Sequence, residues 1–205
     1  MTRGETRSTI AGPAGALEIA LNVPEAAPRG IALVAHPNPA QGGTLDNKVA
    51  QTLARTFVEL GYASVRFNFR GVGASEGSFD GGIGETDDAL AALAFARGQF
   101  LALADAAPVL AGFSFGAYIQ TRVAHTVTAE RMVLIAPAVK RFPVEKVSAG
   151  TIVIHGEQDD VVPLADVFDW ARPQHLPIVV FPGTGHFFHG RLAQLMQTIT
   201  GMWSR

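Results

Sequence analysis

Gly112-Phe113-Ser114-Phe115-Gly116 is the stretch of this sequence that decides the fold. An apolar run at 108–111 precedes it, and a segment of helical character follows from about residue 117. This order predicts a strand, a sharp turn and a helix, with Ser114 at the apex. The glycine on each side removes the Cβ atom that would clash in so tight a turn, and the serine is left strained with its hydroxyl exposed. The pattern is typical of a nucleophile elbow, and it predicts an acid and then a histidine in loops after later strands.

Candidates for both partners follow in that order. The β-branched run at 151–155 indicates a buried strand, and it leads into a loop at 156–163 that carries aspartates. A second apolar run at 177–181 precedes Pro182-Gly183-Thr184-Gly185-His186, where the neighbouring glycine leaves the His186 ring free to orient. The sequence therefore predicts a catalytic triad of Ser114, an aspartate from the first loop and His186. Asp159 and Asp160 are adjacent, and only one of them can face the histidine.

Several further segments give the chain a family resemblance. It resembles the small, lidless bacterial members of the α/β-hydrolase superfamily in His36-Pro37-Asn38-Pro39, in Gly42-Gly43-Thr44-Leu45-Asp46-Asn47-Lys48, and in residues 68–75, 112–116, 155–163 and 183–186. The likeness runs from Gly30 to the C-terminus. It implies a mostly parallel central sheet with helices on both faces and no cap domain. Its His-Gly-x-x-Asp pattern selects Asp159 over Asp160 as the triad acid, and Asn38 departs from it, because many relatives are expected to have a second histidine there.

The order of apolar and helical segments predicts the same α/β architecture. A hairpin is expected from residues 7–10 and 16–23, and further strands at 31–35, 63–69, 131–136, 151–155 and 177–181. Helices are expected at 44–60, with Thr44 as the cap, at 86–97, ending at Gly98, from about 117 through His125, and from about 190. No repeat or linker interrupts residues 1–205, so we expect a single domain.

The connection at 137–150 bears on the shape of the site. About a dozen residues are too few for a helical lid, so the site is expected to be open and to favour small or short-chain esters.

Acyl transfer requires donors for the developing oxyanion. The backbone N–H of Phe115, next after the nucleophile, is one predicted donor. The second is expected from the loop after strand 31–35, where Pro37 and Pro39 have no N–H, so that Asn38 is the predicted donor. Three aromatic side chains could line the substrate pocket, although aromatic residues near strand ends more often belong to the core: Phe142, Phe187 and Phe188.

Other readings of the motifs are weaker. His189 is a rival base, but it lacks flanking glycines, and no third ligand follows His186 and His189 at a metal-site spacing, so we expect no metal. The glycine-rich residues 70–77 have Glu76 where a dinucleotide fingerprint needs glycine, and no cofactor is predicted. His36 and His155 end strands and are expected to organise their loops by hydrogen bonding.

Composition limits the partners. The chain has 205 residues, 48% of them hydrophobic and 17% charged, with a net charge of −2, which gives no case for binding nucleic acid or an anionic membrane. It has no cysteine, so a disulfide framework and a thiolate nucleophile are excluded. The first residues show no apolar signal segment, which favours a cytoplasmic location. The oligomeric state is not predicted.

These patterns together predict a serine hydrolase that acts on a small carboxylic ester. A thioesterase or acyltransferase would use the same triad. A catalytically silent binding protein on the same fold is the alternative of another class, but it would be expected to have lost Ser114, His186 or the acid loop, and all three are present.

Overall fold

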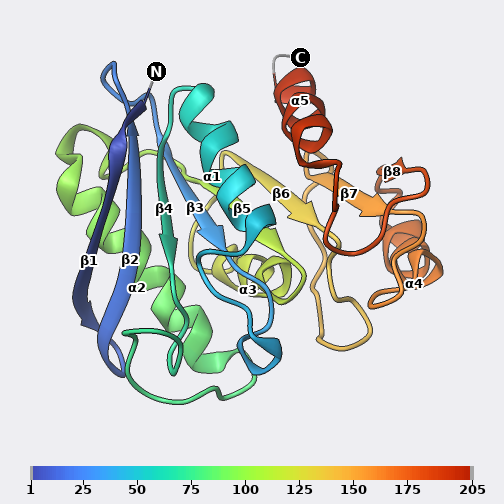
Figure 1. The fold of residues 1–205 in the computed structure, drawn as a ribbon, viewed down its shortest axis with the longest axis horizontal. Coiled ribbons are helices and arrows are strands. Elements are labelled where there is room, and N and C mark those ends of the chain that lie inside the picture. The colour runs from blue at the N-terminus through green and yellow to red at the C-terminus, as the bar shows by residue number, and fades with distance from the viewer. Residues whose placement is uncertain (1, 204–205) are drawn as a thin grey trace.

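The computed structural model describes residues 2–203, and its centre is one eight-stranded sheet with the order β1-β2-β4-β3-β5-β6-β7-β8 (Figure 1). The strands are β1 (Thr2–Gly12), β2 (Gly15–Pro24), β3 (Ile31–Ala35), β4 (Ala63–Phe67), β5 (Val109–Phe113), β6 (Arg131–Ile135), β7 (Ile152–Gly156) and β8 (Ile178–Phe181). The hairpin β1–β2 is antiparallel and joins β4 in antiparallel pairing, whereas all pairs from β4 to β8 are parallel. The predicted hairpin and mostly parallel sheet are confirmed.

Helices cover both faces of this sheet. They are α1 (Lys48–Glu59), α2 (Ile83–Gln99), α3 (Phe115–Val123), α4 (Leu164–Ala171) and α5 (Leu192–Trp203), with short 3₁₀ turns at Pro39–Gln41, Leu101–Leu103 and Arg172–Gln174. Alternate residues of a strand face opposite sides, so the sheet feeds two cores. Leu110 of β5 belongs to the core that includes side chains of α2, α3 and α4, and Val109 and Ala111 belong to the core that includes side chains of α1 and α5.

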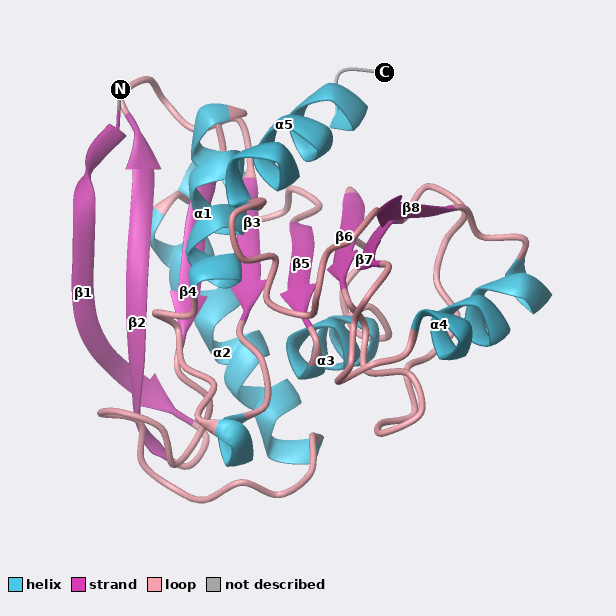
Figure 2. Cartoon of the chain, turned by 45° about the vertical axis from the view of Figure 1, so that its right-hand side comes forward, coloured by secondary structure: helices cyan, strands magenta, loops and turns pink. Residues whose placement is uncertain are grey.

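The sheet brings the functional segments to one edge. Figure 2 shows β3, β4, β5 and β6 pointing the same way, so the loops that follow them gather at their carboxyl ends. No helix forms between β6 and β7, in agreement with the predicted lack of a lid. Within residues 2–203, no helix combines the length and apolar character needed to cross a membrane.

The first long helix starts later than predicted. It begins at Lys48, and its cap is Asn47 rather than Thr44, because Asn47 Oδ1 accepts the N–H groups of Val49 (2.9 Å) and Ala50 (3.3 Å). Thr44 instead accepts the N–H of Asp46 in the preceding turn (3.2 Å). The predicted cap was wrong because both residues are good N-cap formers and tertiary contacts chose between them.

Other predicted boundaries also differ. Helix α2 starts at Ile83, three residues early, because the buried Glu85 carboxylate accepts the Gly82 N–H (2.7 Å), and the helix continues through Gly98. Helix α3 ends at Val123, so His125 lies beyond it in an exposed turn and pairs with Glu145.

Candidate active site

Ser114 occupies the turn between β5 and α3, in the backbone conformation φ 56°, ψ −113°. This region is costly for a side chain with a Cβ, by about 1–3 kcal/mol, and the surrounding contacts must hold it. The Ser114 N–H donates to Ile135 O on the neighbouring strand (2.9 Å). A Cβ at Gly112 would lie 2.3 Å from Gly116 O, and one at Gly116 would lie 2.3 Å from Ala35 O. Both glycines are therefore required by close backbone approach, as the sequence pattern predicts.

Asp159 follows β7 and is 6% exposed, whereas Asp160 is exposed. Its Oδ2 lies 2.7 Å from His186 Nδ1. Its Oδ1 accepts the N–H groups of Val161 (3.0 Å) and Val162 (2.7 Å). The structure therefore brings Asp159, and not Asp160, to the histidine. The catalytic role of Asp159 stays a prediction.

The Asp159 carboxyl is held in its ionised form. Burial alone would raise its pKa, but the hydrogen bonds from His186 and from the Val162 N–H outweigh burial and lower the pKa below the ordinary value. A carboxylate can only accept, so His186 Nδ1 carries the proton and its N–H donates a hydrogen bond to Asp159 Oδ2. This fixes the tautomer of His186 and leaves Nε2 as the basic nitrogen.

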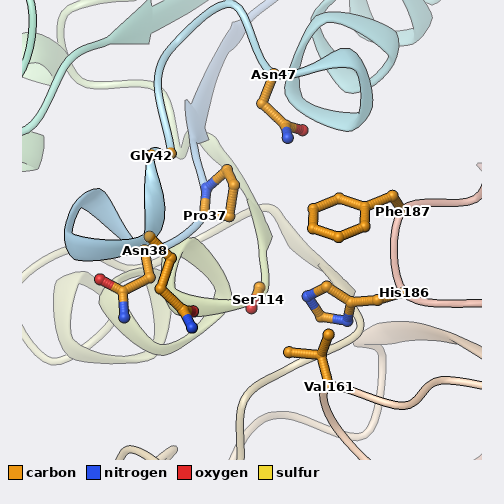
Figure 3. A pocket seen from close by; sticks show the side chains of 10 residues that line it. Pro37, Asn38, Gly42, Asn47, Ser114, Val161, His186 and Phe187 are labelled. Carbon is orange, nitrogen blue, oxygen red and sulfur yellow. The ribbon is translucent and has the colours of Figure 1, made fainter.

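His186 lies in the loop after β8 and is 4% exposed. Its ring packs against Phe113 (centroids 4.8 Å apart) and Phe187 (5.1 Å). Figure 3 shows the ring beside Ser114, with one nitrogen directed towards the serine hydroxyl. The rival base His189 is exposed, and its ring contacts Phe187 (centroids 5.8 Å apart) rather than a carboxylate.

His155 supports the acid loop from inside the protein. Its ring is fully buried, its Nε2–H donates to Val162 O (2.8 Å), and the same nitrogen lies 3.4 Å from Asp159 Oδ2. Burial lowers its pKa, so the ring is neutral and its Nδ1 is a buried acceptor without a hydrogen-bond partner. The predicted role of His155 in organising its loop is confirmed by these contacts.

His36 plays the same part for the loop after β3. Its Nδ1–H donates to Pro37 O (2.7 Å), and its Nε2 accepts the Phe69 N–H (3.1 Å). Complete burial lowers its pKa to about 3, so the ring is neutral at ordinary pH. Pro37 O and the Asn38 N–H belong to one peptide group, so His36 fixes the plane of that peptide and polarises it towards stronger donation by the N–H.

The two predicted oxyanion donors are both available. The Phe115 N–H opens α3, where the helix dipole favours negative charge. Neither this N–H nor that of Asn38 donates to any acceptor within residues 2–203. Asn38 O accepts the N–H groups of Gln41 and Gly43 (3.0 Å each), which closes the loop that carries the Asn38 N–H.

A cavity of about 280 Å³ opens above these groups (Figure 3). Its lining includes Ser114 and His186, together with Asn38, Gln41, Asn47, Val161 and Phe187. Among residues 2–203, no cluster of three or more histidine and acidic side chains could hold a metal ion.

Only one of the three predicted pocket aromatics lines this cavity. Phe187 does, and it is 44% exposed. Phe188 is fully buried and packs on Phe181, because its left-handed backbone (φ 53°) turns its ring the opposite way from that of Phe187. Phe142 packs on Phe115 and Tyr118 in the core on the α3 side. The assignment of Phe188 and Phe142 to the pocket was therefore wrong.

Among the lining side chains that the sequence reasoning did not assign to the site are those of Gln41, Asn47 and Val161. Gln41 and Asn47 lie within residues 36–48, the stretch that begins and ends with motifs of the family resemblance, so that stretch was the available signal. Val161 follows the acid by two residues and carried no signal of its own, because its placement depends on how the Asp159 carboxylate turns the loop.

Comparisons with known proteins agree with this fold. Residues 16–153 match the model of a family described as X-Pro dipeptidyl-peptidase (S15 family). An α/β serine hydrolase without a lid from Xanthomonas campestris is 38% identical, with a TM-score of 0.90 over 98% of this chain and 94% of that one. An α/β serine hydrolase homologue from Coxiella burnetii is also 38% identical, with a TM-score of 0.86 over 98% of this chain and 97% of that one. An uncharacterized protein of Rickettsia prowazekii is 32% identical over 82% of this chain and 76% of its own length.

Proposed function

The chain belongs to the α/β serine hydrolases and, among them, to the S15 family, and from this premise we propose that it hydrolyses small carboxylic esters through an acyl-enzyme on Ser114. The observation that carries the proposal is the 2.7 Å hydrogen bond between His186 Nδ1 and Asp159 Oδ2 at the wall of a cavity that also contains Ser114. An ionised acid, an oriented imidazole and a serine at the cavity wall are the parts that acyl transfer needs.

The first half of the reaction forms the acyl-enzyme. His186 Nε2 accepts the proton of the Ser114 hydroxyl as Oγ attacks the ester carbonyl carbon. The C=O π electrons move to the carbonyl oxygen, and the N–H groups of Phe115 and Asn38 stabilise that oxyanion. The intermediate then collapses, the bond to the alcohol oxygen breaks, and His186 returns the proton to the leaving alcohol. Asp159 stabilises the imidazolium while it exists.

The second half repeats these steps with water. His186 takes a proton from a water molecule, whose oxygen attacks the acyl carbon, and the Ser114 ester bond breaks as the proton passes to Ser114 Oγ. The products are a carboxylic acid and an alcohol. No cofactor is needed to balance either half.

The size of the cavity supports a small substrate. About 280 Å³ is just below the volumes of most small-molecule sites, which run from roughly 300 to 1,000 Å³. The irregular connection between β6 and β7 adds no cover. Both observations favour short acyl chains over long ones.

Release of dipeptides, which the description of the matched family model names, finds less support here. An enzyme that cuts at a free amino terminus has to bind an ammonium group, and a carboxylate near the nucleophile is the usual partner for it. Among the residues described as lining the cavity, none carries a free carboxylate. Hydrolysis of a neutral ester does not require a carboxylate that binds an ammonium group.

The experiment that tests the proposal is hydrolysis of p-nitrophenyl esters from acetyl to dodecanoyl, with Ser114→Ala measured beside the native protein. We expect activity concentrated at acetyl to hexanoyl and lost in the variant. Absence of Ser114-dependent hydrolysis at every chain length would contradict an ester substrate. Hydrolysis of the matching thioesters alone would instead assign the same triad to a thioesterase.

A further inference from the structure

Side-chain amides form part of the cavity wall, and they come from a single loop. Asn38, Gln41 and Asn47 all line the cavity, and all lie between β3 and α1. Figure 3 shows Asn47 reaching from the start of α1 towards Phe187, with its amide nitrogen on the cavity side. The catalytic steps above use none of these three side chains.

The amide of Asn47 has only one possible orientation. Its Oδ1 accepts two N–H groups at the start of α1, those of Val49 (2.9 Å) and Ala50 (3.3 Å). An amide nitrogen in that position would face two donors, so the oxygen must occupy it and Nδ2 must face away from the helix. Nδ2 has no acceptor within residues 2–203, and it is therefore a fixed, unused donor at the cavity.

Asn38 repeats this arrangement at the other end of the loop. It caps the 3₁₀ turn Pro39–Gln41, where its Oδ1 accepts the Ala40 N–H (2.9 Å). Its backbone (φ −53°, ψ 119°) is close to that of Asn47 (φ −53°, ψ 134°). In each asparagine the side-chain oxygen accepts a backbone N–H, and the NH₂ group can donate to a ligand.

The side facing the loop of amides is apolar. Val161 and Phe187 are 43% and 44% exposed, a large fraction for such side chains, and both line the cavity. No aspartate, glutamate, lysine or arginine is among the described lining residues. The site thus offers neutral donors to one part of a ligand and an apolar surface to another, which suits an uncharged molecule.

We infer that the substrates are neutral esters with an additional acceptor oxygen, such as an ether or hydroxyl oxygen, and that Asn47 Nδ2 determines this preference by donating to that oxygen. The inference rests on the proposed esterase function and names its substrate class. Asn47 is a specificity residue that contacts substrate away from the reacting carbonyl, whereas the backbone of Asn38 serves the oxyanion.

The test compares matched pairs of esters in the native protein and in Asn47→Asp. One pair varies the acyl part, p-nitrophenyl methoxyacetate against p-nitrophenyl butyrate, and the other varies the alcohol, 2-methoxyethyl butyrate against butyl butyrate. Asn47→Asp has the same shape and keeps an acceptor for the start of α1, but it removes the donor. The ratio of kcat/KM within a pair, compared between the two proteins, cancels the intrinsic reactivity of each ester.

We expect Asn47→Asp to lower the ratio of kcat/KM for the oxygenated ester to kcat/KM for the plain ester by about fivefold or more in one of the two pairs, because one hydrogen bond is lost. The Tm should be preserved. Gln197→Glu, an exposed amide in α5 away from the cavity, controls for the added charge and should leave both ratios unchanged. Unchanged ratios in Asn47→Asp for both pairs would overturn the inference while the esterase function stands. If no ester of either pair is hydrolysed in a Ser114-dependent way, the proposed function fails and this inference fails with it.

Discussion

Replacing Asp159 with asparagine should remove nearly all turnover while the protein stays folded. The substitution keeps the size of the side chain and changes one oxygen to NH₂. Asp159 Oδ1 accepts the N–H groups of Val161 and Val162, and in the variant the amide oxygen must take that place. The NH₂ group then faces His186, where the carboxylate Oδ2 now lies 2.7 Å from Nδ1.

This reversal forces the wrong tautomer on the histidine. Because the new NH₂ donates, His186 Nδ1 has to accept, and the ring proton moves to Nε2, the nitrogen that faces Ser114. A protonated Nε2 cannot accept the serine proton. A wrong tautomer in such a triad costs about 10⁴-fold in kcat, or about 5.5 kcal/mol of transition-state stabilisation. The two hydrogen bonds to Val161 and Val162 persist, so the Tm should fall by only a few degrees.

The assay is steady-state hydrolysis of p-nitrophenyl butyrate, with thermal unfolding followed by circular dichroism. Asp160→Asn is the matched control, because Asp160 is exposed and adjacent, and we expect its kcat to stay within about twofold of the native value. A kcat for Asp159→Asn within tenfold of the native value, or an equal loss in Asp160→Asn, would refute the tautomer argument.

Three further substitutions test the buried and exposed parts of the site. His36→Phe leaves the Phe69 N–H and Pro37 O unpaired in the core, and urea unfolding should show a loss of about 2–5 kcal/mol. In the native protein His36 titrates at about 3, below its unfolded value of about 6.5, so only the unfolded chain binds its proton between those pH values. The contribution of His36 to stability is complete above pH 6.5 and falls by up to about 1.4 kcal/mol per pH unit as the pH drops towards 3. If the difference in the free energy of unfolding between the native protein and the variant did not change over this pH range, this argument would be contradicted. Phe187→Ala should raise KM for p-nitrophenyl butyrate several-fold with little change in Tm, whereas Phe188→Ala should cost about 3–5 kcal/mol of stability, and similar behaviour of the two variants would count against their opposite placement.

The parts of the site that the sequence predicted are those fixed by local pattern. The positions on either side of Ser114 must be glycine because a Cβ at either one would lie 2.3 Å from a backbone oxygen, so the turn could be predicted from five residues. The strands before Asp159 and His186 are short apolar runs, and parallel strands carry their following loops to one edge of the sheet. Chain order was therefore enough to predict which loops meet.

Features decided by tertiary contact could not be predicted. Thr44 and Asn47 are both favourable caps. Asn68 Oδ1 and the Arg66 guanidinium hold the N–H and the carbonyl of Leu45 in a non-helical turn, and this places the start of the helix after Asn47. Both of those residues lie more than twenty positions away in the chain. The sequence around the cap therefore gives no indication of these contacts with Leu45.

Neighbouring residues of similar character were equally ambiguous. Phe187 is 44% exposed and Phe188 is fully buried, and Phe188 has a left-handed backbone. Asp159 and Asp160 could be separated by the family pattern, but not by composition or spacing. Asp159 is oriented by two hydrogen bonds that its carboxylate accepts from backbone N–H groups. These hydrogen bonds cannot be recognised in the sequence.

Labelling with a fluorophosphonate, followed by peptide mass spectrometry, tests most directly whether Ser114 is a nucleophile activated by His186. We predict one adduct, on Ser114, none on Ser114→Ala, and labelling slowed at least a hundredfold in His186→Ala. No adduct on the folded native protein, or labelling of Ser114 at an unchanged rate without His186, would contradict the central claim.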